Sequence, residues 1–151
     1  MENIFTPPVL GSEVLPEPSK KSRPFRILHA DDDEDIRCYL KDILTQAGYA
    51  VDTARDGAGA WDDLRRNSYD LLITDNDMPE ISGVGLIAKL RNAQMKLPVI
   101  MVTTAAPDQE FAKRPWLMPD AVVLKSVMSE QLLGKVKAVL CSRENLQPVN
   151  V

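Results

Sequence analysis

Carboxylate side chains gather at two places in the sequence, each directly after a short apolar run. FRILHA (25–30) leads into the acidic run DDDED (31–35), and YDLLIT (69–74) leads into Asp75, with Asp77 two residues further on. Carboxylates that share a site repel one another and need a counter-ion, and hard oxygen ligands suit Mg²⁺. Aspartate is also a nucleophile toward phosphoryl groups. The candidate chemistry is therefore magnesium-dependent transfer of a phosphoryl group onto an aspartate.

Two further side chains complete this chemistry. The apolar run PVIMVT (98–103) ends in Thr103, and AVVLK (121–125) ends in Lys125. A phosphoryl group in transfer carries negative charge on three oxygens, each of which needs a partner. The metal, the Lys125 ammonium and the Thr103 hydroxyl with nearby backbone amides would supply the three partners.

The acidic run divides into two parts. Asp33, Glu34 and Asp35 fit the first turn of a helix, where acidic side chains are favoured by the helix dipole. Asp31 and Asp32 come before that turn and are therefore the candidate metal ligands.

Three residues with ring side chains are interpreted as structural rather than functional. His29 lies inside an apolar run and is interpreted as a hydrogen-bonded histidine of the core or sheet face, rather than as a phospho-acceptor. Trp61 and Trp116 are interpreted as packing residues rather than as a stacking platform for nucleic acid.

Five apolar runs rich in Val, Ile and Leu predict strands, and apolar residues at helical spacing predict a helix after each strand. The strands are 25–30, 49–54, 69–74, 98–103 and 121–125. The main helical stripes lie at 36–47, 60–64, 86–90 and 132–140, and a short helix is expected over 108–114 between two prolines. Gly48 is expected to end the first helix, Asp56 to cap the second and Ser129 to cap the fifth.

Five β-α units in a row predict an α/β fold, a doubly wound parallel sheet with helices on both faces. In such folds the ligand site lies beyond the carboxyl ends of the strands. Those ends are where the acidic residues, Thr103 and Lys125 fall.

Composition excludes several classes of function. The 151 residues carry 18 basic and 22 acidic side chains, a net charge of −4, so direct binding to nucleic acid is not expected. No apolar run reaches the ~18 residues of a membrane span, so no membrane insertion is expected. Cys38 and Cys141 lie far apart and form no metal or redox motif, which favours a cytoplasmic setting.

The chain divides into three parts. Residues 1–24 hold five of the eleven prolines and are interpreted as a Pro-rich N-terminal tail. Residues 25–143 form the globular domain, and residues 144–151 form a short C-terminal tail.

The segments ILHADDDEDIR, LLITDNDMPEISG, PVIMVTT and VVLK, in this order and spacing, resemble the receiver domain of two-component response regulators. The resemblance covers about residues 25–143 and implies a flavodoxin-like (βα)5 fold with strand order 2-1-3-4-5. Because the residues after the fifth helix are too few for an effector, the chain resembles a stand-alone receiver that signals by binding another protein.

The resemblance also implies a role for each site residue. Asp75 matches the phosphorylated aspartate, and Asp77 matches the position whose backbone carbonyl binds Mg²⁺. Asp31 and Asp32 match the acidic pair that holds the metal together with Asp75. Thr103 and Lys125 match the hydroxyl and ammonium that bind the phosphoryl group. The donor would be a histidine kinase or a histidine phosphotransfer protein, and the chain would catalyse only its own phosphorylation and dephosphorylation.

The sequence departs from the family pattern at three positions. Ser126 stands where proline usually follows the lysine, Val122 stands at the switch aromatic, and Thr104 is larger than the usual residue. In the family the lysine–proline bond is typically cis, and a cis Lys125–Ser126 bond is expected here because Lys125 must still reach the pocket. Two alternatives stay open: a constitutive interaction module with impaired switching, and a haloacid-dehalogenase-like phosphatase, whose D-x-D motif Asp75 and Asp77 superficially match.

Overall fold

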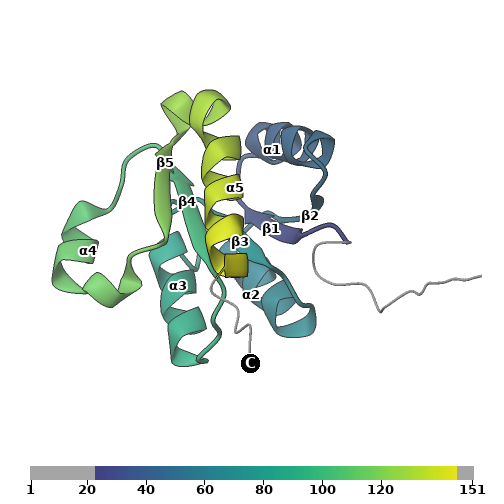
Figure 1. Ribbon diagram of the computed structural model, residues 1–151. Coiled ribbons are helices and arrows are strands. Elements are labelled where there is room, and N and C mark those ends of the chain that lie inside the picture. The colour runs from purple at the N-terminus through teal and green to yellow at the C-terminus, as the bar shows by residue number, and fades with distance from the viewer. Residues whose placement is uncertain (1–22, 146–151) are drawn as a thin grey trace, which may run out of the picture.

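The computed structural model describes residues 23–145 of the chain, with side chains described as far as Ser142 (Figure 1). The strands are β1 (Arg26–Ala30), β2 (Ala50–Ala54), β3 (Leu71–Thr74), β4 (Val99–Thr103) and β5 (Ala121–Leu124). The α-helices are α1 (Glu34–Gln46), α2 (Gly57–Arg66), α3 (Gly83–Asn92), α4 (Asp108–Lys113) and α5 (Met128–Asn145). Two short 3-10 turns, η2 (Pro115–Leu117) and η3 (Lys125–Val127), flank β5. All five predicted strands and five predicted helices are confirmed.

The strands form one parallel sheet of order β2-β1-β3-β4-β5. Ala30, the last residue of β1, pairs with Ala54 of β2 and with Thr74 of β3. The carboxyl ends of these strands therefore meet at one edge of the sheet. The predicted fold class and strand order are confirmed.

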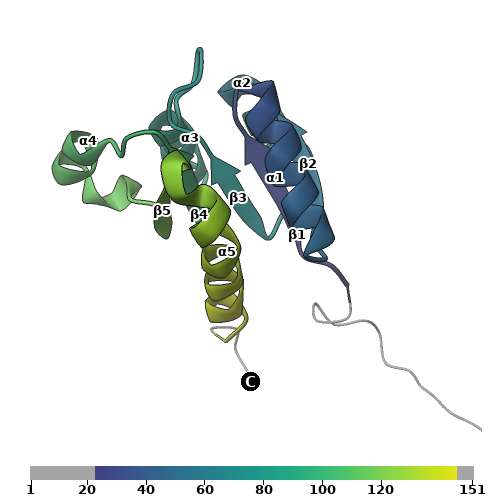
Figure 2. The same cartoon turned by 90° about the horizontal axis from the view of Figure 1, so that it is seen from above.

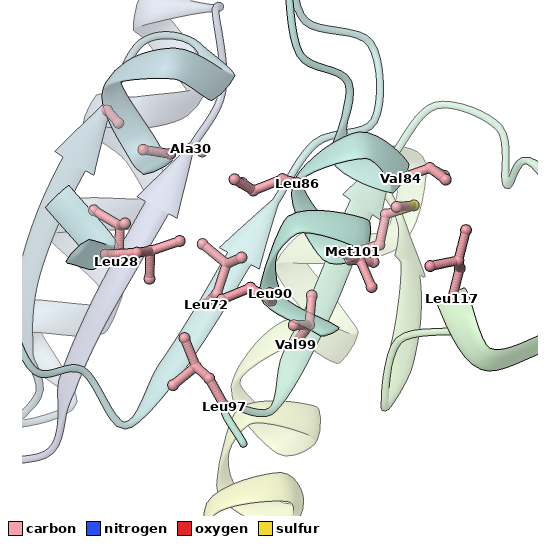
Figure 3. Close-up of a cluster of buried hydrophobic side chains, with 14 of the residues drawn as sticks. Leu28, Ala30, Leu72, Val84, Leu86, Leu90, Leu97, Val99, Met101 and Leu117 are labelled. Carbon is pink, nitrogen blue, oxygen red and sulfur yellow. The ribbon is translucent and has the colours of Figure 1, made fainter. Parts of the chain in front are cut away.

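Two apolar cores lie on the two faces of the sheet, and helices cover both of these faces (Figures 1 and 2). Helices α1 and α5 cover one face, where Leu40 and Leu132 are fully buried. Helices α2 and α3 cover the other face, and Figure 3 shows Leu86 and Leu90 of α3 directed toward Leu72 of β3. Because both faces are covered, β3 and β4 are buried along their whole length, as their continuously apolar sequences predict.

Local sequence sets the ends of the helices. The Asp33 carboxylate caps α1, and the Asp56 carboxylate caps α2 as predicted, accepting the Gly59 N–H at 2.7 Å. Gly48 follows α1 with φ 102°, a conformation that side chains with a Cβ rarely adopt. The predicted Ser129 cap is wrong, because η3 runs directly into α5 and places Ser129 inside the helix.

Helix α4 has only six residues and stands out from the sheet on the β5 side in both views (Figures 1 and 2). Phe111 of α4 and Leu117 of η2 reach the core. The prediction that Trp116 is a packing residue is wrong: the residue is 63% exposed, because η2 turns the neighbouring Leu117 inward instead. Trp61 does pack against the core.

The predicted tails, 1–24 and 144–151, fall almost entirely outside the described residues, and their boundaries stay predictions. Within the described part of the chain, no helix is both long enough and apolar enough to cross a bilayer.

Candidate functional site

Asp31 is the most deeply buried acid at the carboxyl edge of the sheet. It follows β1, its N–H donates to the Ala54 carbonyl at 3.1 Å, and its side chain has no exposed surface. Its Oδ1 accepts the Asp33 N–H at 2.9 Å. Asp32, the next residue, is exposed. The turn from β1 into α1 thus supplies one buried and one exposed carboxylate side by side.

Asp75 reaches the same place from β3. Its N–H donates to the Ala30 carbonyl at 2.9 Å, so the start of the β3–α3 loop is tied to the end of β1. The Asp75 carboxylate is almost fully buried, and its Oδ1 accepts the Asn76 N–H at 2.7 Å. One oxygen from each of Asp31, Asp32 and Asp75 lies within 4.8 Å of the others.

Lys125 joins the two buried carboxylates. Its Nζ lies 3.0 Å from Asp31 Oδ2 and 3.1 Å from Asp75 Oδ2, and its side chain is 20% exposed. The end of β5 therefore supplies a single ammonium that lies between acids from β1 and β3.

The Lys125–Ser126 peptide bond is trans, as are all described peptide bonds, so the expected cis bond is wrong. The expectation assumed that only a cis bond directs the ammonium to the pocket. Here the 3-10 turn of η3 carries the chain from β5 into α5 while Lys125 still reaches both carboxylates.

The charges of the site shift its pKa values. Burial raises the pKa of Asp31, and the negative charge of Asp75 adds to this, against the opposing effects of the Asp33 N–H and Lys125. Burial by itself lowers the pKa of Lys125, but its close contacts with the negative Asp31 and Asp75 carboxylates outweigh burial and leave that pKa above its usual value. Lys125 is therefore protonated at neutral pH, whereas burial disfavours the charged form of Asp31.

The cluster fits a magnesium ion in two respects. Its three ligand atoms are carboxylate oxygens, the ligand type that Mg²⁺ prefers. In addition, the buried Asp31 Oδ2 has no hydrogen-bond donor among the described residues and contacts only the Lys125 ammonium as an ion pair. An added cation would partner this oxygen.

Two predicted site residues, Thr103 and Asp77, form no side-chain hydrogen bond with the acidic cluster among the described residues. Thr103 is fully buried at the end of β4, and its hydroxyl donates to the Ala105 carbonyl at 3.4 Å. Asp77 is exposed in the β3–α3 loop. Within residues 23–145, neither side chain forms a hydrogen bond with Asp31, Asp75 or Lys125.

His29 is buried, as predicted, but it is not hydrogen-bonded. Neither ring nitrogen has a hydrogen-bond partner among the described residues. Burial, and then the positive charges of Lys125 and Arg37, lower the pKa of His29 to about 3, so the ring is neutral. A buried neutral ring in the middle of a strand is not placed to accept a phosphoryl group.

Sequence reasoning missed three residues that hold the site in shape. Arg37 of α1 donates from its guanidinium to the Asp31 carbonyl at 2.8 Å. The Asn76 side-chain oxygen accepts the Val84 N–H at 3.0 Å, which ties the loop after Asp75 to α3. Gly83 packs so closely that a Cβ there would lie 2.4 Å from the Asp75 carbonyl oxygen. Asn76 and Gly83 lie within the segment that resembles the family, but nothing in their spacing from Asp75 indicates these contacts.

Comparison with known proteins identifies the family. The sequence profile of the response regulator receiver domain matches residues 27–137. Response regulator RppA of Synechocystis sp. is 31% identical over 125 residues, which are 82% of this chain and 53% of RppA. PhoP of Bacillus subtilis, an alkaline phosphatase synthesis transcriptional regulatory protein, is 32% identical over 82% of this chain and 51% of its own length. The chain spans about half the length of the curated relatives it matches.

Solved structures agree in fold. Response regulator TrrA of Thermotoga maritima, solved in complex with Mg²⁺-BeF, is 34% identical with a TM-score of 0.67, over 76% of this chain and 97% of that one. A CheY-like receiver domain protein of Methanospirillum hungatei is 28% identical with a TM-score of 0.76, over 82% and 99%. The cluster of Asp31, Asp32 and Asp75 is typical of phospho-accepting receivers. On the profile match, the fold and the acidic site, this chain belongs to the response regulator receiver domain family.

Proposed function

We propose that this receiver is a signalling switch that accepts a phosphoryl group on Asp75. The observation that carries the proposal is the position of the Asp75 carboxylate, almost fully buried, 3.1 Å from the Lys125 ammonium and grouped with Asp31 and Asp32. This grouping combines a nucleophile, a fixed positive charge and oxygen ligands for a cation in one pocket.

The chemical step forms one bond and breaks one bond. A carboxylate oxygen of Asp75 attacks the phosphorus of a phosphohistidine on a histidine kinase or phosphotransfer protein. The phosphorus–nitrogen bond breaks, and the donor imidazole leaves with the electron pair and takes up a proton from water. Lys125 already lies against Asp75 and would pair with a phosphoryl oxygen, and the Thr103 hydroxyl would pair with another.

Asp31, Asp32 and Asp75, with the backbone carbonyl of Asp77, would hold the magnesium ion. When bound, the ion neutralises charge that develops on the phosphoryl oxygens. TrrA, solved in complex with Mg²⁺-BeF, supports this assignment by likeness of sequence and fold.

Phosphorylation would act on a downstream protein through a change in surface. A phosphoryl group adds roughly −1.5 to −2 charge. In a pocket where Lys125 lies at the end of β5, this charge would be communicated to β5 and to the turn that leads into α5. The downstream partner is proposed to be a protein rather than nucleic acid, since this net-negative chain has no basic surplus.

Acetyl phosphate with Mg²⁺, followed by intact-mass measurement, tests the proposal. The wild-type chain should gain one phosphoryl group, whereas Asp75→Asn, whose amide lacks a nucleophilic oxygen anion, should gain none and remain folded. Asp42→Asn is the control: it removes an exposed carboxylate of α1 outside the site and should still gain the phosphoryl group.

Other outcomes would contradict the proposal. Failure of the wild-type chain to gain mass would favour the constitutive interaction module. Incorporation into Asp75→Asn at the wild-type rate would exclude Asp75 as the acceptor. Two observations argue against the phosphatase alternative: the chain belongs to the receiver family, and Asp75 follows the third strand rather than the first.

A further inference from the structure

A cavity of about 520 Å³ lies at the end of the sheet opposite the acidic cluster. Its lining includes Leu97, just before β4, and Asp120, just before β5, whereas Asp75 and Lys125 follow the carboxyl ends of their strands. A volume of this size lies within the roughly 300–1,000 Å³ typical of small-molecule sites. Phosphorylation of Asp75 makes no use of this cavity.

Three cationic side chains line the cavity, each from a different segment. Arg91 belongs to α3, Lys96 to the α3–β4 connection and Lys135 to α5. Within the described part of the chain, none of the three forms an ion pair with a carboxylate. Helix α3 with the connection that follows it, and the distant helix α5, thus bring unpaired positive charge to one concave surface.

The helix dipole accounts for only part of this charge. Arg91 lies in the last turn of α3, where a cation is favoured. Lys96 lies beyond that helix, and Lys135 lies in the middle of α5, so neither offsets the end of a helix. Binding of an anionic ligand would account for the positions of all three cationic side chains.

Asp120 adds a fixed hydrogen-bond acceptor to the cationic cavity. Its Oδ2 accepts the Val99 N–H at 2.8 Å, and its own N–H donates to the Val99 carbonyl at 2.8 Å. A carboxylate has about four lone-pair positions, so a held Asp120 can accept further hydrogen bonds from a ligand. A negative charge would repel a simple anion, but it suits a ligand that carries N–H donors away from its anionic end.

The remaining wall of the cavity is partly apolar. Leu97 is buried beneath it, and Val139 of α5 is half-buried beside it. Such a wall suits a flat ring rather than a fully hydrated ion.

We propose that this cavity binds a nucleotide, with its phosphates on Arg91, Lys96 and Lys135 and the edge of its base on Asp120. Guanine is preferred over adenine, because guanine presents two adjacent N–H donors to a carboxylate, whereas adenine presents a ring-nitrogen acceptor beside its amino group. The site does not depend on phosphorylation of Asp75.

Titration of the full chain with GDP, followed by amide NMR and calorimetry in EDTA, tests the proposal. Removing Mg²⁺ prevents the acidic cluster from recruiting phosphate. GDP should shift the amides of Leu97, Ala121 and Val139 saturably, and ADP should bind more weakly. Lys96→Ala and Lys135→Ala should each weaken GDP binding about tenfold, the loss of one charge-assisted hydrogen bond.

Matched controls separate a built site from general attraction between charges. Lys137→Ala removes an exposed lysine of the same helix that does not line the cavity, and it should leave GDP affinity unchanged. Asp120→Asn, whose amide oxygen can still accept the Val99 N–H, should keep its melting temperature and lose the preference for GDP over ADP.

Several results would overturn the proposal. These are the absence of saturable shifts at millimolar GDP, equal weakening by Lys137→Ala and Lys135→Ala, pyrophosphate binding as tightly as GDP, or shifts centred on Asp31 and Asp75.

Discussion

Lys125 serves as the counter-ion of the acidic site. Three carboxylates, those of Asp31, Asp32 and Asp75, share the pocket with this one ammonium, so the site keeps excess negative charge. Charges removed from water are destabilising unless their partners compensate. The same excess charge that makes the site attract a cation therefore weakens the fold when no cation is bound.

Asp31→Asn should stabilise the metal-free protein at neutral pH. The folded-state pKa of Asp31 is raised by burial, so the native state retains a proton that the unfolded chain loses as pH rises. Wild-type stability therefore falls as the pH rises from the ordinary aspartate pKa, ~3.9, through the raised folded-state pKa. Asparagine does not ionise, so the variant does not lose stability in this way. Thermal melts in EDTA should show a gain of about 2–5 °C at pH 7 that vanishes below about pH 4. A gain of equal size at both pH values would show that the charge is not its cause.

Individual side chains differ in how far the sequence predicts them. Asp31, Asp75 and Lys125 could be predicted to converge, because each follows a predicted parallel strand and such ends share an edge of the sheet. The contact of Arg37 with the Asp31 carbonyl could not, since a donor to a backbone carbonyl leaves no pattern in the sequence. The unpartnered His29 was unpredictable for a related reason: whether a buried ring finds a partner depends on packing.

At the scale of elements, the loop between β3 and α3 positions Asp75, the proposed acceptor. Its backbone is held where the Gly83 N–H donates to the Asn76 carbonyl at 3.0 Å, directly beside Asp75. The close approach of Gly83 to this loop leaves no space for a side chain.

Gly83→Ala should therefore destabilise the fold and slow phosphorylation. The added Cβ would lie 2.4 Å from the Asp75 carbonyl oxygen and 2.9 Å from Asn76 Cα, so the loop must shift. The expected loss is about 1–3 kcal/mol, measured by urea unfolding, with a slower gain of mass from acetyl phosphate. Gly134→Ala is the control. Open space surrounds this helical glycine, and alanine there should raise the free energy of unfolding by about 0.5–1 kcal/mol. Unchanged stability of Gly83→Ala would contradict the tight packing.

Ser126→Pro should destabilise this protein, although proline is the usual family residue there. Lys125 lies in the 3-10 turn η3, and a following proline disfavours helical backbone angles. A loss of about 1–3 kcal/mol is expected in denaturant unfolding, while Ser126→Ala at this exposed position should be nearly neutral. An increase in stability with proline would show that the turn adopts another path with equal ease.

The elements themselves were largely predictable. Strands β3 and β4 could be predicted from apolar runs of strand length. Both faces of the sheet are covered there, so these strands contain few polar residues. The start of α5 was misplaced because a serine ahead of an apolar helical stripe is a good cap candidate. The sequence does not show that η3 already makes the chain helical before Ser129. The order of the strands came from the family resemblance, since periodicity alone does not determine it.

For the whole molecule, Mg²⁺ should raise the melting temperature. A ligand that binds only the folded state at ten times its dissociation constant stabilises by about 1.4 kcal/mol. Asp32→Ala should remove most of this shift, and Asp35→Ala, which removes an exposed acid of the first turn of α1, should retain it. A melting curve unmoved by millimolar Mg²⁺ would show that the three carboxylates do not form a cation site.

The outlying position of α4 has a consequence for the motions of the whole domain. This six-residue helix and η2 are joined to the core mainly through Phe111 and Leu117, whereas β3 lies between two strands with both faces covered. Segments with few buried contacts open locally at a free-energy cost well below that of global unfolding. Deuterium should therefore enter the amides of residues 108–117 long before those of β3, and mass spectrometry of peptic fragments can follow both. Equal protection of the two segments would mean that α4 opens only when the entire domain does.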